Sequence, residues 1–91
     1  MGYRLFTQDL RRESILAILD AYFDGYTVTP SIGAWKSKHE SSLTIDLFDV
    51  EESQVQAAAR EIAAMNGQDA VAVMAYNAVV TLESPQYAIA A

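Results

Sequence analysis

Residues 26–50, YTVTPSIGAWKSKHESSLTIDLFDV, decide the fold of this chain. They form two extended runs, 26–35 and 41–48, joined by a polar link. The second run alternates between two faces, as a strand with one buried side does, and its apolar face consists of Leu43, Ile45 and Leu47. A slip of one residue would bury Asp46, so we expect a firm register. The stretch therefore predicts a pair of antiparallel strands at the centre of the chain.

The first run carries two residues that mark its place in the sheet. Pro30 has no N–H group to donate to a neighbour, so we expect this strand to lie at an edge. Gly33 favours a bulge or bend, which would explain why Trp35 breaks the alternation. Residues 36–42 are polar and predict either a turn or an extended hairpin tip.

The segment before this pair supplies a strand and a helix. Residues 3–7 alternate as a short strand, and we expect Asp9 to cap the following helix with its carboxylate. Gly25 is expected to end that helix. The apolar stripe advances in steps of three and four residues, and it consists of Ile15, Ile18, Leu19, Tyr22 and Phe23.

The segment after the pair again supplies a helix and a strand. Asp49 and Glu52 have the spacing of a capping box at the start of the helix, and Gly67 is expected to end it. The predicted buried stripe consists of Val55, Ala58, Ala59, Ile62 and Met65. Residues 70–83 predict one long strand or two short strands broken near Tyr76.

The order strand, helix, strand, strand, helix, strand is the split βαβ, or ferredoxin-like, arrangement of the α+β class. We expect one domain over residues 1–85, with an antiparallel sheet, both helices on one face and room for a short fifth strand. Residues 86–91 form an apolar tail. The second face of the sheet is then left for solvent or a partner, and its predicted members are Arg4, Phe6, Thr44, Asp46 and Phe48.

Two phenylalanines on that face are more apolar than plain exposure to water favours. The sequence therefore predicts a homodimer, and the residues expected in or near the contact are Phe6, Thr44, Asp46 and Phe48.

The composition limits the classes of partner. Twelve acids against six bases give the 91-residue chain a net charge of −6, which disfavours nucleic acid because phosphates attract bases. The longest apolar run, residues 70–75, is too short to cross a bilayer. The chain has no cysteine and its N-terminus shows no secretory signal, so we expect a cytoplasmic protein.

Several short elements recur in a known pattern. They are Arg4-Leu5-Phe6, Gly33-x-Trp35, Glu40-x-Ser42, Gly67-Gln68-Asp69-Ala70-Val71 and Ala78-x-Val80. Over residues 3–82 the chain resembles a bacterial family of small proteins of unknown function with Gly-x-Trp, Glu-x-Ser-x-x-Val and Gly-Gln-Glu-Ser-Val elements. Many members carry an export signal, which is not visible in this sequence, and Asp69-Ala70 replaces the family's Glu-Ser. The resemblance implies that one shared feature contains Trp35, Glu40, Ser42, Gly67 and Gln68.

The chemistry of the side chains argues against catalysis. His39 adjoins Glu40, but neighbouring residues of a strand point to opposite faces and cannot easily work together. One histidine and no cysteine leave only carboxylates as metal ligands, and helix capping explains those that cluster, which are Asp46, Asp49, Glu51 and Glu52. Neither a nucleophile elbow nor a glycine-rich phosphate loop is present. We therefore predict no catalytic residue, no metal and no cofactor.

Two functional classes remain. The first is a non-enzymatic protein-interaction module with an acidic surface, by analogy with mobile-element or phage-type inhibitors such as anti-CRISPR and other anti-defence proteins. The second is a ferredoxin-like dimer that binds a small molecule or catalyses a simple acid–base reaction near Trp35, His39 and Glu40. The candidate binding residues are Trp35, Lys36, His39, Glu40, Ser42 and Gln68.

Overall fold

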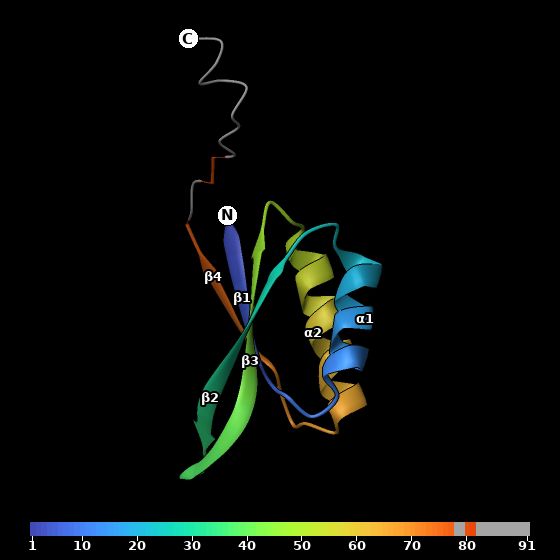
Figure 1. The fold of residues 1–91 in the computed structure, drawn as a ribbon. Coiled ribbons are helices and arrows are strands. Elements are labelled where there is room, and N and C mark those ends of the chain that lie inside the picture. The colour runs from blue at the N-terminus through green and yellow to red at the C-terminus, as the bar shows by residue number, and fades with distance from the viewer. Residues whose placement is uncertain (78–79, 82–91) are drawn as a thin grey trace, which may run out of the picture.

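The computed structural model describes residues 1–77 and 80–81, except for the side chain of Trp35. Its elements follow the predicted ferredoxin-like order (Figure 1). They are β1 (Gly2–Gln8), α1 (Arg12–Tyr22), β2 (Thr27–Trp35), β3 (Lys38–Phe48), α2 (Glu52–Asn66) and β4 (Ala72–Tyr76).

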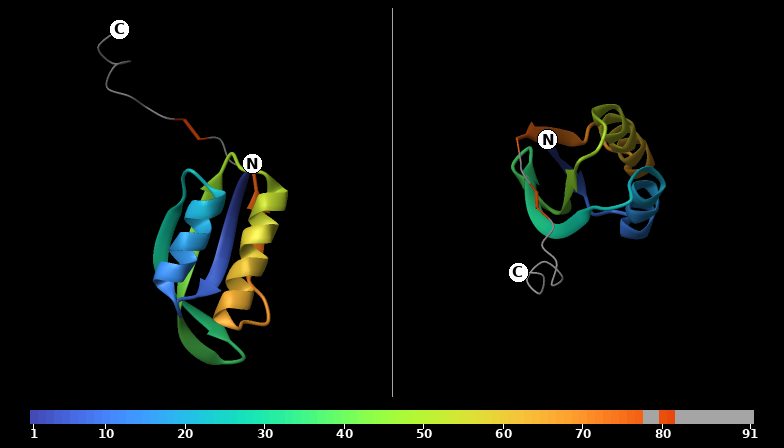
Figure 2. Two further views of the ribbon diagram at one scale, coloured as in Figure 1. Left: turned by 90° about the vertical axis from the view of Figure 1, so that its right-hand side faces the viewer. Right: turned by 90° about the horizontal axis from the view of Figure 1, so that it is seen from above.

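The four strands form one antiparallel sheet in the order β2-β3-β1-β4. Both helices cover the same face of this sheet, as Figure 2 shows from two further sides. Strand β2 lies at an edge, as Pro30 predicts. The bulge expected at Gly33 is wrong, because β2 and β3 pair residue by residue from Thr27 to Trp35.

The core lies between the helices and one side of the sheet. Leu43, Ile45 and Leu47 are fully buried, which confirms the predicted register of β3. Leu5 of β1 lies opposite Ile45 and is equally buried. The helices contribute the predicted stripes, and their buried residues are Ile15, Leu19, Val55, Ala58, Ala59 and Ile62. Burial of this apolar surface is the main source of stability that the fold offers.

The hairpin of β2 and β3 extends beyond the helices (Figure 1). Its turn consists of Lys36 and Ser37 alone, and β3 begins at Lys38, so the extended hairpin tip is the correct alternative. Lys36 and Ser37 have φ angles of 50° and 64°. Two positive φ values in a two-residue loop are those of a type I′ turn, whose hand matches the twist of the strands.

The predicted caps at the helix N-termini are wrong. Helix α1 begins at Arg12, and the Asp9 carboxylate accepts a hydrogen bond from Arg12 Nη2 at 2.5 Å. The Asp9 side chain is therefore used by a guanidinium and not by the backbone. Helix α2 begins after Glu51 without a side-chain cap, and Asp49 lies earlier, at a φ of 58°.

The two helix C-termini differ from each other. Helix α2 ends as predicted, because Gly67 adopts the left-handed conformation with a φ of 68°. Helix α1 ends at Tyr22 and continues into extended backbone at Phe23. Gly25 is therefore not the residue that ends α1, and its backbone needs no positive φ.

Strand β4 is a short edge strand of five residues. It pairs with β1 from Ala72 opposite Phe6 to Tyr76 opposite Gly2. Residues 78–79 and 82–91 lie outside the described residues, and with them the alternative of a second strand and the predicted tail.

Candidate functional site

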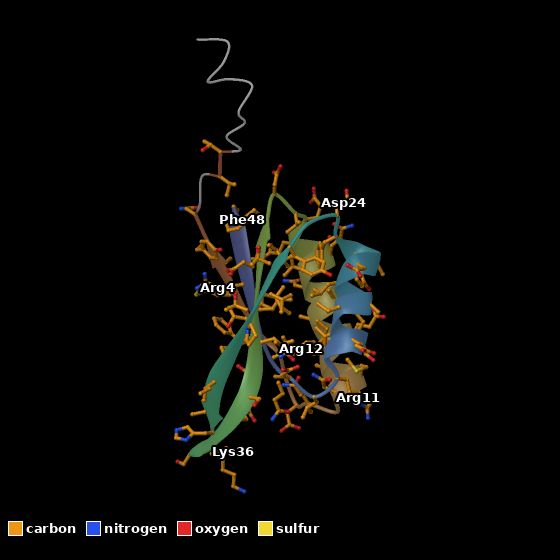
Figure 3. The ribbon with its side chains drawn as sticks, in the orientation of Figure 1. Arg4, Arg11, Arg12, Asp24, Lys36 and Phe48 are labelled. Carbon is orange, nitrogen blue, oxygen red and sulfur yellow. The ribbon has the colours of Figure 1, made fainter. Side chains whose placement is uncertain are left out.

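The face of the sheet that the helices leave uncovered is the candidate site. The cross-strand register places Arg4 beside Asp46 and Met74, and Phe6 beside Thr44. Figure 3 shows the Arg4 side chain on the side of the sheet away from the helices. Phe6 is 40% exposed, which is a large fraction for a phenylalanine in the middle strands of a sheet. We call this surface the open face.

Arg4 is the centre of one cluster on the open face. Its Nε atom donates to Asp46 Oδ1 at 2.6 Å, and its guanidinium carbon lies 5.7 Å from the ring centre of Tyr76. The hydrogen bond to Asp46 raises the pKa of Arg4 above its ordinary value. The two charges offset each other, so this part of the open face is close to neutral.

An aromatic pair adjoins this cluster. The rings of Phe48 and Tyr76 meet edge to face, with centres 6.2 Å apart. Gly2 lies beneath them on β1, and a Cβ atom there would stand only 2.8 Å from the Tyr76 ring. The lack of a side chain at Gly2 therefore lets Tyr76 lie flat against β1.

A concave region with a volume of about 650 Å³ occupies the other end of the open face. It lies between the hairpin, the end of β1 and the segment that follows α2. We call it the hollow, and the residues that carry its chemistry are Phe6, Gln8, Ser31, Glu40, Ser42, Thr44, Gln68 and Asp69.

Three hydroxyl groups form a row in the hollow. Ser31 Oγ lies 2.9 Å from Ser42 Oγ and 3.1 Å from Thr44 Oγ1. Beyond this row, Gln8 Nε2 donates to Glu40 Oε2 across β1 and β3. Gln8 thereby holds the half-buried carboxylate of Glu40 over the open face.

A polar cluster supports one wall of the hollow. Thr7 is only 3% exposed, and its hydroxyl donates to Gln68 Oε1 at 2.6 Å. Asn66 Nδ2 donates to the same Gln68 oxygen at 2.8 Å and to the carbonyl oxygen of Gln8 at 3.1 Å. These hydrogen bonds fix the end of β1 to the end of α2, so the side-chain amide of Gln68 stabilises the fold at this point.

The structure brings together some of the predicted binding residues and separates others. Glu40, Ser42 and Gln68 line the hollow, as does Gly67 from the shared feature implied by the family resemblance. Lys36 lies at the tip of the hairpin (Figure 3). The side chain of Trp35 lies outside the described residues.

His39 and Glu40 do not form a site together. Glu40 pairs with Gly33 on the open face, whereas His39 pairs with Ala34 and therefore faces the other way. His39 is exposed to solvent. The acid–base site expected near Trp35, His39 and Glu40 is therefore not assembled from this histidine and this carboxylate.

Sequence reasoning missed Gln8 and Ser31 as residues of the hollow and Tyr76 as the partner of Arg4. Gln8 could have been found by extending the alternation of Arg4 and Phe6 by two residues. Ser31 required the exact pairing of β2 with β3, which the expected bulge would have shifted.

Exposed carboxylates gather at one end of the described chain. The end where α1 finishes and α2 begins carries exposed carboxylates (Figures 1 and 3), and these are Asp20, Asp24, Asp49, Glu51 and Glu52. We call it the acidic end. Figure 3 shows basic side chains toward the opposite end, at Arg11, Arg12 and Lys36.

Among the described residues, no group of three or more acidic, histidine or cysteine side chains is arranged to hold a metal ion. Neither helix of the described chain has the length and apolarity that a bilayer span requires.

Comparisons with known proteins bear on the fold alone. No family model and no curated protein matches the sequence. A crystal structure of a DUF3240 family protein from Shewanella baltica superimposes with a TM-score of 0.65, covering 90% of this chain and 94% of that chain at 14% identity. The designed protein Foldit4 gives a TM-score of 0.49 at 22% identity, covering 80% and 89% of the two chains. The bacterial neighbour belongs to a family of unknown function, so the likeness gives the ferredoxin-like fold and no activity.

Proposed function

We propose that this protein is a non-catalytic interaction module. It pairs with a second copy through the open face and presents its acidic end to a basic surface of a partner protein. The observation that carries this proposal is the distribution of charge, because Arg4 and Asp46 offset each other on the open face and exposed carboxylates gather at one end of the described chain.

One carboxylate of the acidic end is unfavourable for the fold. Asp20 lies in the last turn of α1, where the helix dipole is negative and a carboxylate is unfavourable. No basic side chain occupies that turn to compensate. The fold offsets part of this cost, because Glu51 and Glu52 suit the positive N-terminus of α2 and Asp20 accepts a hydrogen bond from Tyr26. Attraction to a positively charged partner would use the whole group of carboxylates.

An acidic surface of this kind suits a partner that otherwise binds nucleic acid. Carboxylates can occupy a basic surface built for phosphates, which is how an inhibitor from a mobile element or phage would act on a host defence complex. This subtype rests on analogy of size and charge.

The open face suits a second copy of the chain. A twofold axis through this face brings the same patch of both copies together, so that Arg4 of each copy can meet Asp46 of the other. Two chains with a net charge of −6 repel each other elsewhere. Phe48 and Met74 are exposed apolar side chains of this face that are available to the contact, and Phe6, which lines the hollow, lies at its margin.

Affinity capture from the native host tests the partner. The tagged wild type is compared with Glu51→Gln/Glu52→Gln at the acidic end and with Glu13→Gln/Asp69→Gln as a control of equal net charge. We expect the wild type and the control to retain the same basic protein, and the acidic-end variant to retain about tenfold less. Retention should also fall steeply as salt rises to physiological strength.

Equal capture by both double variants, or a complex that salt does not weaken, would contradict the proposed role of the acidic end. Failure to retain any specific protein would count against the interaction module itself.

A further inference from the structure

We infer that the hollow is a binding site for a linear aliphatic polyamine. The inference rests on the charge, the hydrogen-bonding groups and the length of the hollow, and it goes beyond the proposed partner at the acidic end.

The charge of the hollow calls for a cation. Glu40 and Asp69 both line it, and none of the described side chains that line it is basic. The Oε2 atom of Glu40 is held by Gln8, and no described residue donates to the Oε1 atom. One oxygen of a positioned carboxylate is therefore left to accept a hydrogen bond from a ligand.

The hydroxyl row calls for a ligand with N–H groups. Each hydroxyl has one donor and two acceptor positions. The two hydrogen bonds that Ser31 makes with Ser42 and Thr44 use two of the three donors. The row is therefore rich in acceptors and poor in donors, which suits a chain of ammonium groups better than a phosphate or a carboxylate.

Phe6 completes the site at the end away from Glu40. It lies opposite Thr44 on β1, and its half-exposed ring can take an ammonium or an alkyl segment against its face. Thr44 lies four positions after Glu40 on β3, which corresponds to about 13 Å along the strand. A triamine such as spermidine can reach across this distance, whereas a single ammonium ion cannot.

The same geometry disfavours a metal ion. Hard cations take six or more oxygen ligands around one point. Among the described residues no three carboxylate or imidazole side chains are arranged to hold a metal ion, and the hollow offers only Glu40 and Asp69 as anionic ligands.

Isothermal titration of the full chain with spermidine tests the inference. We expect one spermidine per chain and a loss of affinity of about tenfold or more in Glu40→Gln, as for a hydrogen bond to a charged group. The control, Glu13→Gln, removes the same charge from the first turn of α1, outside the hollow, and should change the affinity less than about twofold. Phe6→Leu keeps an apolar side chain but lacks the ring face, so it should weaken binding by a few-fold.

If a variant does not fold, the changes in the amide chemical shifts of the wild type on addition of spermidine locate the site. Changes confined to residues of the hollow such as Gly33, Ser42 and Gln68 support the inferred site. Equal losses in Glu40→Gln and Glu13→Gln, or shifts gathered at the acidic end, would reduce the binding to general attraction by an acidic protein and overturn the inference. Phe48→Asp, which should prevent pairing of the chain, should still bind spermidine, so failure of the proposed dimer would leave this result unchanged.

Discussion

At the scale of the residue, two isoleucines of the central hairpin occupy opposite situations. Ile45 is fully buried between the sheet and the helices, whereas Ile32 is 82% exposed. Ile45→Ala leaves a cavity in the core, so we expect the free energy of unfolding to fall by about 3 kcal/mol. Ile32→Ala should lower it by no more than about 0.5 kcal/mol. Urea unfolding measures both, and equal losses would show that β3 does not pack in this register.

Two glycines provide a second residue-level comparison. Gly67 has a φ of 68°, and no atom would obstruct a Cβ there, so its requirement lies in the backbone alone. Gly67→Ala should destabilise the protein by about 1 kcal/mol. Gly25→Ala also meets no neighbour and needs no positive φ, so it should leave stability unchanged or raise it by about 0.5 kcal/mol. Thermal unfolding distinguishes the two variants, and a loss at Gly25 equal to that at Gly67 would contradict this assignment.

Two tyrosines link stability to alkaline pH. Tyr26 donates to Asp20 at 2.5 Å and Tyr22 to Glu61 at 2.7 Å, and these hydrogen bonds raise the pKa of both phenols above the ordinary value of 10.0. Their contribution is complete below the pKa of the unfolded chain and is lost as the pH rises through the folded pKa. The free energy of unfolding should therefore fall as the pH rises above about 10, and less so in Tyr22→Phe/Tyr26→Phe. Parallel profiles for the variant and the wild type would refute this linkage.

The alternation of apolar and polar residues in the sequence predicted the correct faces of the strands, because the side-chain period of a strand is fixed by its geometry. The caps could not be predicted in the same way. Asp9 has the right type and position to cap α1, but Arg12 competes for its carboxylate with a charge-assisted hydrogen bond. Such competition depends on where α1 begins, and the sequence pattern does not resolve this to one residue.

At the scale of the element, the turn of the β2–β3 hairpin holds two residues in an unfavourable backbone conformation. Lys36 and Ser37 adopt positive φ values in a two-residue turn that favours Asn-Gly. Lys36→Asn/Ser37→Gly should therefore raise the free energy of unfolding by about 1 kcal/mol without moving the strands. Lys38→Asn, adjacent to the turn but within β3, serves as a control that should not stabilise. Urea unfolding gives the comparison, and a destabilised double variant would exclude the type I′ turn.

The order and type of the elements followed from the sequence because each has a clear period and the helices have long apolar stripes. The prediction of a bulge at Gly33 was wrong, because a glycine in a strand is compatible with either a bulge or regular pairing. In the structure Gly33 pairs regularly with Glu40. Because Gly33 has no side chain, the space beside Ser42 on the open face is not filled from β2.

At the scale of the whole molecule, the hollow is a product of tertiary structure. The family resemblance grouped Glu40, Ser42 and Gln68, but their meeting requires both the pairing of β1 with β3 and the return of the chain after α2. His39 was grouped with them by sequence proximity, and strand geometry turns it away. Composition likewise gave the net charge of −6 but not the gathering of exposed carboxylates at the acidic end.

The pairing of two open faces decides which surfaces remain free, so it is the claim on which the account depends most. Sedimentation equilibrium at high micromolar concentration measures it directly. We predict a wild-type mass twice the 10.0 kDa of one chain. Phe48→Asp places a charge within the contact and should give a monomer, whereas Leu10→Asp, at a 57% exposed position before α1, should remain a dimer. A monomeric wild type, or a Phe48→Asp variant that is still dimeric, would contradict the account.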